Sequence, residues 1–244
     1  MSEVTGSTNP GLPVAVVTGA SQGLGLALAE ELGRRGWALV VDARRADRLD
    51  AAVARLSTRT TVVGVAGDVT DPDHRAELCR VAASLGTVGL LVNNASTLGA
   101  SPLPALDEIT PETLRRIFDV NVVAPLALVH DLGDLLDERA TILNITSDAA
   151  VEPYPSWGGY GASKAALEHA SRVLAVERPD LRVLVVDPGD MRTEMHQDAF
   201  PGVDITDRPE PETRVPALLT LVEGDHPSGR YQAEAWAPAA SRQP

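Results

Sequence analysis

The chain has 244 residues and a hydrophobic content of 44%, which is enough for one large domain with a full core. Its formal net charge of −13 argues against nucleic acid or an anionic membrane as a partner, and its single cysteine, Cys79, excludes an intrachain disulfide and a cysteine-based metal cluster. No apolar run reaches the length of a membrane span and residues 1–11 lack the pattern of a signal peptide, so we expect a cytoplasmic protein.

Short apolar runs alternate along the chain with amphipathic segments, which is the pattern of a parallel sheet with helices between its strands. Strands are predicted at residues 14–19, 37–43, 61–69, 88–96, 140–147, 181–189 and 230–236. Helices are predicted within 20–36, at 46–57 and 72–85, from Thr110 onward, and at 159–177 and 212–223. The fold class is therefore α/β, with a Rossmann-type, doubly wound and mostly parallel sheet of about seven strands and helices on both faces.

The same pattern has no internal repeat and no clear domain boundary. We expect a single domain over residues 12–237, with a disordered N-terminal tail at 1–11 and a C-terminal tail at 238–244. The segment 190–210 is rich in Pro, Asp and Glu, and we expect an irregular loop there that acts as a lid ordered by substrate.

The segment TGASQGLG, residues 18–25, joins the first predicted strand to the first helix. Gly19, Gly23 and Gly25 permit a tight turn, a close approach of the backbone to a ligand and a closely packed helix. The free N–H groups and the positive dipole end of that helix are suited to a pyrophosphate. The loop therefore indicates a dinucleotide site, although its spacing G-x-x-x-G-x-G differs from the commoner G-x-G-x-x-G.

The same loop also matches the nucleophile elbow G-x-S-x-G of α/β-hydrolases, through Gly19, Ser21 and Gly23. Asp187 and His196 follow in the order of a catalytic triad. A hydrolase elbow lies after several strands, whereas only 20 residues precede Ser21. A serine hydrolase that uses Ser21 is therefore the less favoured alternative.

Tyr160 and Lys164 stand four residues apart in a predicted helix, so their side chains lie on one face, about 6 Å apart along the axis. A neighbouring cation favours the phenolate, so we expect the pKa of Tyr160 to fall from about 10 toward the range of a general acid or base. Lys164 is the only lysine, since the other 20 of the 21 Lys and Arg residues are Arg. A compact ammonium is not interchangeable with a guanidinium beside a reacting phenol, so we interpret the pair as functional.

With these two motifs in place, residues 13–236 resemble the short-chain dehydrogenase/reductase family in its compact single-domain form. Further ordered landmarks carry the resemblance: Asp68-Val69, NNAS at 93–96, Asn121 in DVNVVAP, Ser147 at the end of NITS, and PGDMRT at 188–193. The resemblance implies an NAD(P)-dependent oxidoreductase that transfers a hydride between a nicotinamide and a small-molecule carbonyl or secondary alcohol. A non-catalytic, dinucleotide-sensing protein of the same fold is the alternative, which the intact Ser147, Tyr160 and Lys164 disfavour.

The resemblance implies four catalytic residues. Tyr160 is the general acid that protonates a carbonyl oxygen, or the base in the reverse direction, and Ser147 hydrogen-bonds the same oxygen. Lys164 binds the nicotinamide ribose and lowers the pKa of Tyr160, and Asn121 holds a water in the proton relay behind Lys164. The family resemblance also implies a homodimer or homotetramer, and nothing in the sequence marks a metal site.

The cofactor-binding residues implied by the resemblance come from loops along most of the chain. They are Gly19, Ser21, Gln22, Gly23, Leu24, Gly25, Arg44, Asp68, Val69, Asn94, Ala95, Tyr160, Lys164, Pro188, Gly189, Met191 and Thr193. Two positions depart from the usual pattern. Ser96 stands where many members have glycine, and Met191 stands where a small β-branched residue is common.

The end of the second strand, VVDARR, predicts a preference for NADP(H), with NAD(H) as the less favoured cofactor. The slot that is acidic in NAD-binding proteins falls on Ala43, and Arg44 follows it with a fork of donors for a 2′-phosphate. Two residues argue the other way. Asp42 lies one position early and is able to repel the phosphate, and Gln22 stands where many NADP users carry a second basic residue.

The segment that joins Ser147 to Tyr160 is predicted to line the substrate pocket, because Tyr154 and Trp157 concentrate aromatic side chains there. Leu98, Met195 and Phe200 are candidates for further apolar walls. His196 is a candidate polar contact to substrate.

Overall fold

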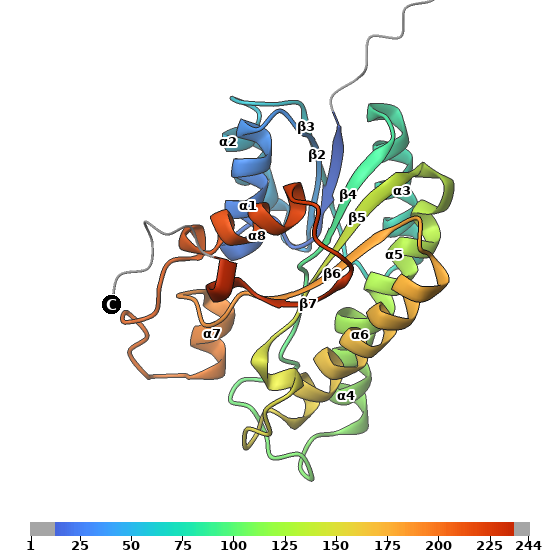
Figure 1. Ribbon diagram of the computed structural model, residues 1–244. Coiled ribbons are helices and arrows are strands. Elements are labelled where there is room, and N and C mark those ends of the chain that lie inside the picture. Colours follow the sequence, from blue (N-terminus) through green and yellow to red (C-terminus); the bar gives the residue numbers. More distant parts are fainter. Residues whose placement is uncertain (1–12, 237–244) are drawn as a thin grey trace, which may run out of the picture.

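The computed structural model describes residues 13–236, and the predicted tails at 1–11 and 238–244 lie outside these residues. Seven strands form one sheet in the order β3-β2-β1-β4-β5-β6-β7, and every neighbouring pair is parallel (Figure 1). The strands are β1 Val14–Val17, β2 Ala38–Ala43, β3 Val62–Ala66, β4 Val88–Asn93, β5 Leu136–Ile145, β6 Arg182–Asp187 and β7 Gly229–Gln232. The predicted Rossmann-type sheet is confirmed, and the direction of strand order reverses between β1 and β4.

Helices cover both faces of this sheet. They are α1 Gly23–Arg34, α2 Ala46–Leu56, α3 Pro72–Leu85, α4 Pro111–Phe118, α5 Ala124–Leu132, α6 Gly158–Glu177, α7 Glu194–Ala199 and α8 Val215–Glu223. In Figure 1, α1, α2 and α8 lie on one face, and α3, α5 and α6 lie on the other. A π-helical turn, Asp119–Val123, joins α4 to α5. Within residues 13–236, none of the helices combines the length and the apolar character that crossing a membrane requires.

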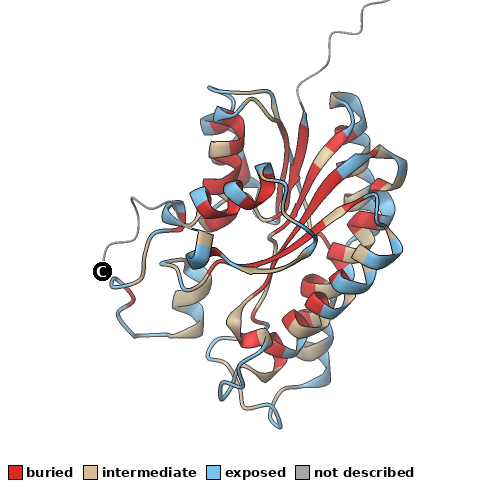
Figure 2. Ribbon diagram, in the orientation of Figure 1, coloured by how far each residue is buried: buried red, intermediate tan, exposed pale blue. Residues whose placement is uncertain are grey.

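The central strands are buried on both faces, as continuous apolar runs predict (Figure 2). One hydrophobic cluster joins the sheet to α1, α2 and α8, with Leu28 and Leu218 fully buried in it. A second cluster joins the opposite face to α3 and α5 through Leu78 and Leu128. Each fully buried leucine contributes roughly 1.5–3 kcal/mol of transfer free energy, so the two layers hold the strand ends in a fixed arrangement.

Two predicted segments differ from the structure. The segment 190–210 is not irregular throughout, because α7 forms within it, with the Thr193 hydroxyl as a cap that accepts from His196 N at 3.1 Å. The predicted strand 230–236 ends at Gln232, and Ala233–Trp236 is a 3-10 helix. In this turn the Trp236 ring packs against His226, with ring centroids 4.5 Å apart.

Candidate active site

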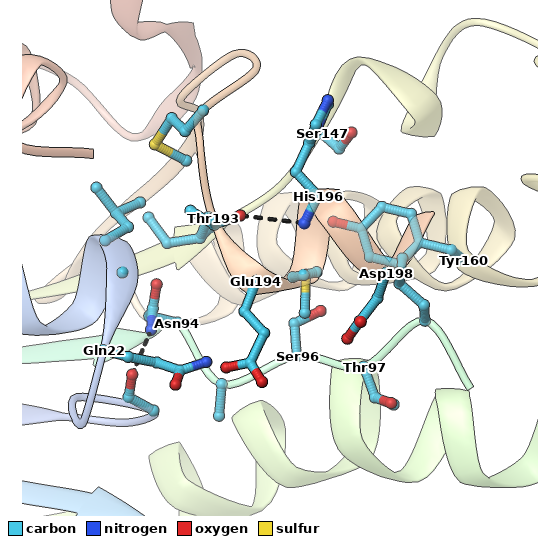
Figure 3. Close-up of a pocket in the computed structure, with 18 of the residues that line it drawn as sticks. Gln22, Asn94, Ser96, Thr97, Ser147, Tyr160, Thr193, Glu194, His196 and Asp198 are labelled. Atoms are coloured by element: carbon cyan, nitrogen blue, oxygen red, sulfur yellow. Dashed lines mark hydrogen bonds between the residues drawn. The ribbon is translucent and has the colours of Figure 1, made fainter. Parts of the chain in front are cut away.

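The carboxyl ends of the strands open into a cavity of about 1250 Å³. It lies at the reversal of strand order, where open α/β sheets bind their ligands. All the predicted site residues line it except Gly25 and Asn121, and Figure 3 shows part of its wall. The folded chain therefore gathers residues from position 19 to position 193 around one space.

The glycine-rich loop packs tightly on the segment that follows β4. Gly19 has a φ of 65°, and a Cβ added there would be 3.0 Å from Ala95 Cα. A Cβ on Gly25 would be 2.4 Å from the carbonyl oxygen of Gly19 and 2.5 Å from Asn94 Nδ2. Asn94 in turn donates to Thr18 O at 2.9 Å and to Gly19 O at 3.1 Å. Glycine is therefore required at these two positions by the contacts themselves.

Gly25→Ala is expected to lower the free energy of unfolding by about 1–3 kcal/mol, because the new methyl group meets backbone and a fixed amide that cannot yield cheaply. Urea unfolding measures this loss. Gly33→Ala, on the same helix, is the matched control, since its Cβ would meet no backbone but the side chains of Thr60, at 2.9 Å, and Leu39, at 3.7 Å. Equal losses in both variants would contradict the steric argument.

The N-terminus of α1 is suited to an anion. Its cap residue, Gln22, makes no side-chain capping hydrogen bond, and the first turn holds no acidic residue. The N–H groups of that turn are thus left without an acceptor from the cap, and they lie at the cavity wall formed by Gln22, Gly23 and Leu24. A pyrophosphate fits this arrangement.

Asp42 is held against the backbone and away from solvent. Its Oδ1 accepts from Gly19 N at 2.7 Å, and its Oδ2 lies 3.1 Å from His74 Nε2. Both side chains are buried, and Gly67 leaves room for the imidazole, since a Cβ there would be 2.2 Å from His74 Nδ1. Both carboxylate oxygens of Asp42 are therefore already engaged.

Three arginines that come shortly after Asp42 in the chain line the cavity: Arg44, Arg45 and Arg48. Arg45 pairs with Asp47 at 2.7 Å, and Arg48 bonds to Gln22 and Glu194. Arg44 is exposed and has no ion-pair or hydrogen-bond partner in the part of the chain that the structure describes. Arg44 is thus the guanidinium of the three that is available to an incoming anion.

Asp68, the predicted adenine contact, follows β3. Burial acts to raise its pKa, but hydrogen bonds from Thr70 and the ion pair with Arg116 outweigh burial and hold the pKa at about 2. The Arg116 Nη2 to Asp68 Oδ2 distance is 2.9 Å. Asp68 therefore stays ionised and acts as an acceptor at neutral pH.

Ser147 meets Tyr160 because a short helical turn packs on α6. The turn, Asp148–Ala150, follows Ser147 directly, and Gly161 allows the close approach, since a Cβ there would be 2.4 Å from Ala149 O. The Ser147 hydroxyl donates to Asp148 Oδ1 at 2.9 Å, and the side chains of Ser147 and Tyr160 both line the cavity. A hydroxyl and a phenol thus share one part of the cavity wall (Figure 3).

Lys164 lies one helical turn after Tyr160 on α6 and is 2% exposed. Its Nζ donates to Ile145 O at 2.9 Å and lies 5.5 Å from the centroid of the Tyr160 ring. Burial lowers the pKa of Lys164 to about 8. The predicted pairing on one helix face is therefore present, with the ammonium fixed by a backbone carbonyl.

The predicted fall in the pKa of Tyr160 is wrong for this structure. Burial is the largest effect and raises the pKa of the phenol well above its ordinary value, because it penalises the phenolate. The neighbouring Ser96 and Ser147 hydroxyls act in the opposite direction, while the charge of Asp187 raises the pKa further. Tyr160 is therefore protonated at neutral pH, as the proton donor of a reduction must be.

Asn121 sits in the π-helical turn between α4 and α5, a local geometry that often marks functional sites. It is fully buried and lies behind the cavity wall. Its amide group bonds to Ser96, Thr97 and Ser163, so it is tied to both the NNAS segment and the Tyr160 helix.

Apolar and aromatic side chains surround the outer part of the cavity. The centroid of the Trp157 ring lies 5.6 Å from that of Tyr160 and 5.9 Å from that of Phe200, and Leu98 and Met195 pack in the same apolar cluster as Trp157 and Tyr160. These are the walls predicted from the sequence.

His196 also lines the cavity. Its Nδ1 is 3.9 Å from Asp190 Oδ1, and its buried Nε2 has no hydrogen-bond partner among the described residues. It remains a candidate polar contact to substrate.

Comparison with known proteins decides the family. Residues 13–204 match the short chain dehydrogenase family. The chain belongs to the short-chain dehydrogenase/reductase family. It is 34% identical to sepiapterin reductase from Xenopus laevis over 218 residues, which cover 84% of this chain and 81% of the relative.

Solved structures of the short-chain dehydrogenase/reductase family share this fold. The oxidoreductase yciK from E. coli superposes with a TM-score of 0.82 at 27% identity, covering 91% of this chain and 95% of that one. The alcohol dehydrogenase from the archaeon Thermococcus sibiricus, complexed with 5-hydroxy-NADP, gives a TM-score of 0.78 at 27% identity, covering 90% and 95%. Membership of the family supports NAD(P)-dependent oxidoreduction as the general activity.

The serine-hydrolase alternative has no support in this short-chain dehydrogenase/reductase. No histidine forms a hydrogen bond with Ser21 in residues 13–236. Asp187 instead accepts from Gly189 N at 3.0 Å and pairs with Arg230, while the nearest carboxylate to His196 is that of Asp190. The three residues do not form a triad.

An ionic cluster near Ser147, with Glu168 and Asp187 buried and Arg230 half-buried, was not predicted from the sequence. Arg230 on β7 donates to Glu168 at 2.9 Å and lies 3.3 Å from Asp187 Oδ2 and 3.4 Å from Ser147 O. Thr146 donates to the same Glu168 oxygen at 2.7 Å. The partners come from three elements far apart in sequence, so no local pattern announces them.

Proposed function

We propose that this short-chain dehydrogenase/reductase reduces a small-molecule carbonyl, or oxidises the corresponding secondary alcohol, with NADP(H) as the preferred cofactor. The observation that carries the proposal is that Ser147, Tyr160 and Lys164 line the same cavity as the glycine-rich loop and Arg44. A hydroxyl, a phenol and an ammonium in one wall are the groups that carbonyl reduction needs.

A bound nicotinamide dinucleotide supplies or accepts the hydride. The α1 N-terminus would hold its pyrophosphate, and Asp68 its adenine. On the protein side, Ser147 hydrogen-bonds the substrate oxygen and Tyr160 gives that oxygen its proton during reduction. Lys164 holds a positive charge behind the phenol, which offsets part of the penalty that burial imposes on the phenolate.

Two features of the structure support the preference for NADP(H). Arg44 presents a free guanidinium directly after the slot occupied by Ala43, where it would pair with a 2′-phosphate. Asp42, the residue that would otherwise hold ribose hydroxyls or repel the phosphate, is bound to Gly19 N and His74. The related alcohol dehydrogenase whose structure contains 5-hydroxy-NADP is consistent with this preference.

We expect wild type to have a higher kcat/KM with NADPH than with NADH. Arg44→Ala, which removes the phosphate partner, and Ala43→Asp, which adds a repelling acid, should each move the ratio toward NADH by about tenfold, or about 1.4 kcal/mol. Steady-state kinetics with both cofactors measures this. Arg45→Ala is the matched control, because Arg45 is already paired with Asp47.

The assignment of the acidic slot to Ala43 would be contradicted by three results together. Wild type would prefer NADH, Arg44→Ala would leave kcat/KM unchanged, and Asp42→Ala would lower kcat/KM. The chemistry is tested separately with a panel of ketones and secondary alcohols. Binding of NADPH by fluorescence titration without turnover of any compound would favour the dinucleotide-sensing alternative over an enzyme.

A further inference from the structure

Asp42 carries a carboxylate that affects the two possible cofactors in opposite ways. It lines the cavity, as Arg44 does, and it lies one position before the slot at Ala43. A carboxylate that faces the ribose accepts hydrogen bonds from the hydroxyls of NADH and repels the 2′-phosphate of NADPH. The direction in which the Asp42 carboxylate points therefore bears on the choice between the two cofactors.

The glycine-rich loop holds one oxygen of this carboxylate. Asp42 Oδ1 accepts from Gly19 N at 2.7 Å, and the backbone carbonyl of Asp42 accepts from Ala20 N at 2.9 Å. Both donors are backbone groups, so they are present whatever side chains the loop carries. The second oxygen, Oδ2, depends instead on a side chain from another part of the chain.

That side chain is His74, in the first turn of α3. Its Nε2 lies 3.1 Å from Asp42 Oδ2, and because a carboxylate only accepts, Nε2 carries the proton and donates it. The side chains of His74 and Asp42 are only 6% and 3% exposed, so the contact is shielded from water. The hydrogen bond thus directs Oδ2 toward α3.

The surroundings of His74 hold the imidazole in this place. A Cβ at Gly67 would be 2.2 Å from His74 Nδ1 and 2.6 Å from its Cγ, so the absence of a side chain there makes room for the ring. The helix α3 is itself fixed by the cap residue Asp71 and by the fully buried Leu78. The position of the donor is therefore set by the fold and not by the carboxylate alone.

We propose that His74 is a positioning residue that determines cofactor specificity. By binding Asp42 Oδ2 it keeps the carboxylate directed toward α3, so that a 2′-phosphate meets the guanidinium of Arg44 without a competing acid. The inference rests on the proposed preference for NADP(H). Without a donor at position 74, Oδ2 loses its partner and the carboxylate is free to turn to the ribose, where it would favour NADH.

The test compares His74→Leu and His74→Gln with wild type by fluorescence titration of NADPH and NADH. Leucine has no donor, whereas the glutamine amide reaches about as far as Nε2 and donates. We expect His74→Leu to move the ratio of the two Kd values toward NADH by roughly tenfold, since the lost hydrogen bond is made to a charged group. His74→Gln should keep the wild-type ratio. His130→Leu, which replaces an exposed histidine of α5 outside the cavity lining, is the matched control and should change neither Kd.

A double-mutant cycle shows whether His74 acts through Asp42. In an Asp42→Ala background no carboxylate is left to direct, so adding His74→Leu should leave the Kd ratio unchanged. Gly67→Ala breaks the same contact in a chain that keeps the histidine, because its methyl group would displace the imidazole. It should move the ratio in the same direction as His74→Leu, and it tests the contact even where His74→Leu does not fold.

The role of His74 alone is overturned if wild type prefers NADPH and His74→Leu or Gly67→Ala weakens both cofactors by the same factor, since the pair would then support only the loop. An equal shift in the Asp42→Ala background would also overturn it, because His74 would act by another route. A wild type that binds NADH more tightly than NADPH would instead overturn the proposed cofactor preference, and this inference with it.

Discussion

Tyr160→Phe is expected to lower kcat by 10²–10⁴-fold, the usual contribution of a positioned general acid, while leaving the NADPH Kd nearly unchanged. The substitution removes only the phenolic oxygen. The ring still packs edge-on against Trp157, with centroids 5.6 Å apart, so the walls of the cavity keep their shape. Steady-state kinetics and fluorescence titration separate the two quantities.

Tyr231→Phe is the matched control for this experiment. The Tyr231 hydroxyl donates to Pro227 O at 2.6 Å and the residue is not among those that line the cavity, so we expect little change in kcat. If Tyr160→Phe retained more than about a tenth of wild-type kcat, the phenol would not be the proton donor.

Most of the sheet could be predicted from the sequence, because central strands are buried on both faces and so must be apolar throughout. Val14–Val17 and Ala38–Ala43 are buried at every position. The edge of the sheet gives no such signal. Among the described residues β7 is an edge strand that pairs with β6 alone, and after Gln232 the chain leaves the sheet and packs Trp236 against Tyr231.

The helix α7 was also missed in the sequence, because it lacks a pattern of buried apolar residues. Glu194–Ala199 spans only six residues, none of them buried, so it shows no apolar periodicity. Its start depends on one cap, the Thr193 hydroxyl, within a segment whose composition favours loops.

Site residues could be predicted where they belong to local motifs, as in the glycine-rich loop and the Tyr160–Lys164 spacing. It could not be predicted where partners meet only in the fold. Asp42 and His74 are 32 residues apart, and Arg230 and Glu168 are 62 apart. The pKa of Tyr160 shows the same limit, because helix spacing gives the distance of the phenol from a cation but not its burial, which raises the pKa.

Lys164→Met is expected to lower kcat/KM at least about 100-fold and, at pH 7, to raise the free energy of unfolding. The loss of activity follows from removing the charge behind Tyr160 and the proposed ribose contact. The gain in stability follows from burial, since Lys164 is 2% exposed and no carboxylate pairs with it among the described residues. Replacing such a buried charge with an apolar side chain of similar volume is often stabilising.

The pKa of Lys164 gives the sign of this effect. Its folded value of about 8 lies below the ordinary 10.5, so the unfolded chain binds more protons between these two values and stability rises with pH across that window. Below about pH 8 the folded protein carries the full cost of the buried ammonium, which is about 3 kcal/mol. The variant also loses the hydrogen bond to Ile145 O, worth about 1 kcal/mol. The net gain is about 2 kcal/mol at pH 7.

Urea unfolding of wild type and Lys164→Met at pH 7 and pH 10 measures this gain, which should shrink at the higher pH as the wild-type lysine loses its proton. Arg172→Met, which removes an exposed cation from the same helix, is the matched control and should change neither stability nor turnover. A Lys164→Met variant less stable than wild type at pH 7 would show that the site stabilises the ammonium. Wild-type kcat/KM in the same variant would show that Lys164 takes no part in the reaction. The expected combination, a more stable and inactive protein, would show that the chain retains its only lysine at a cost in stability.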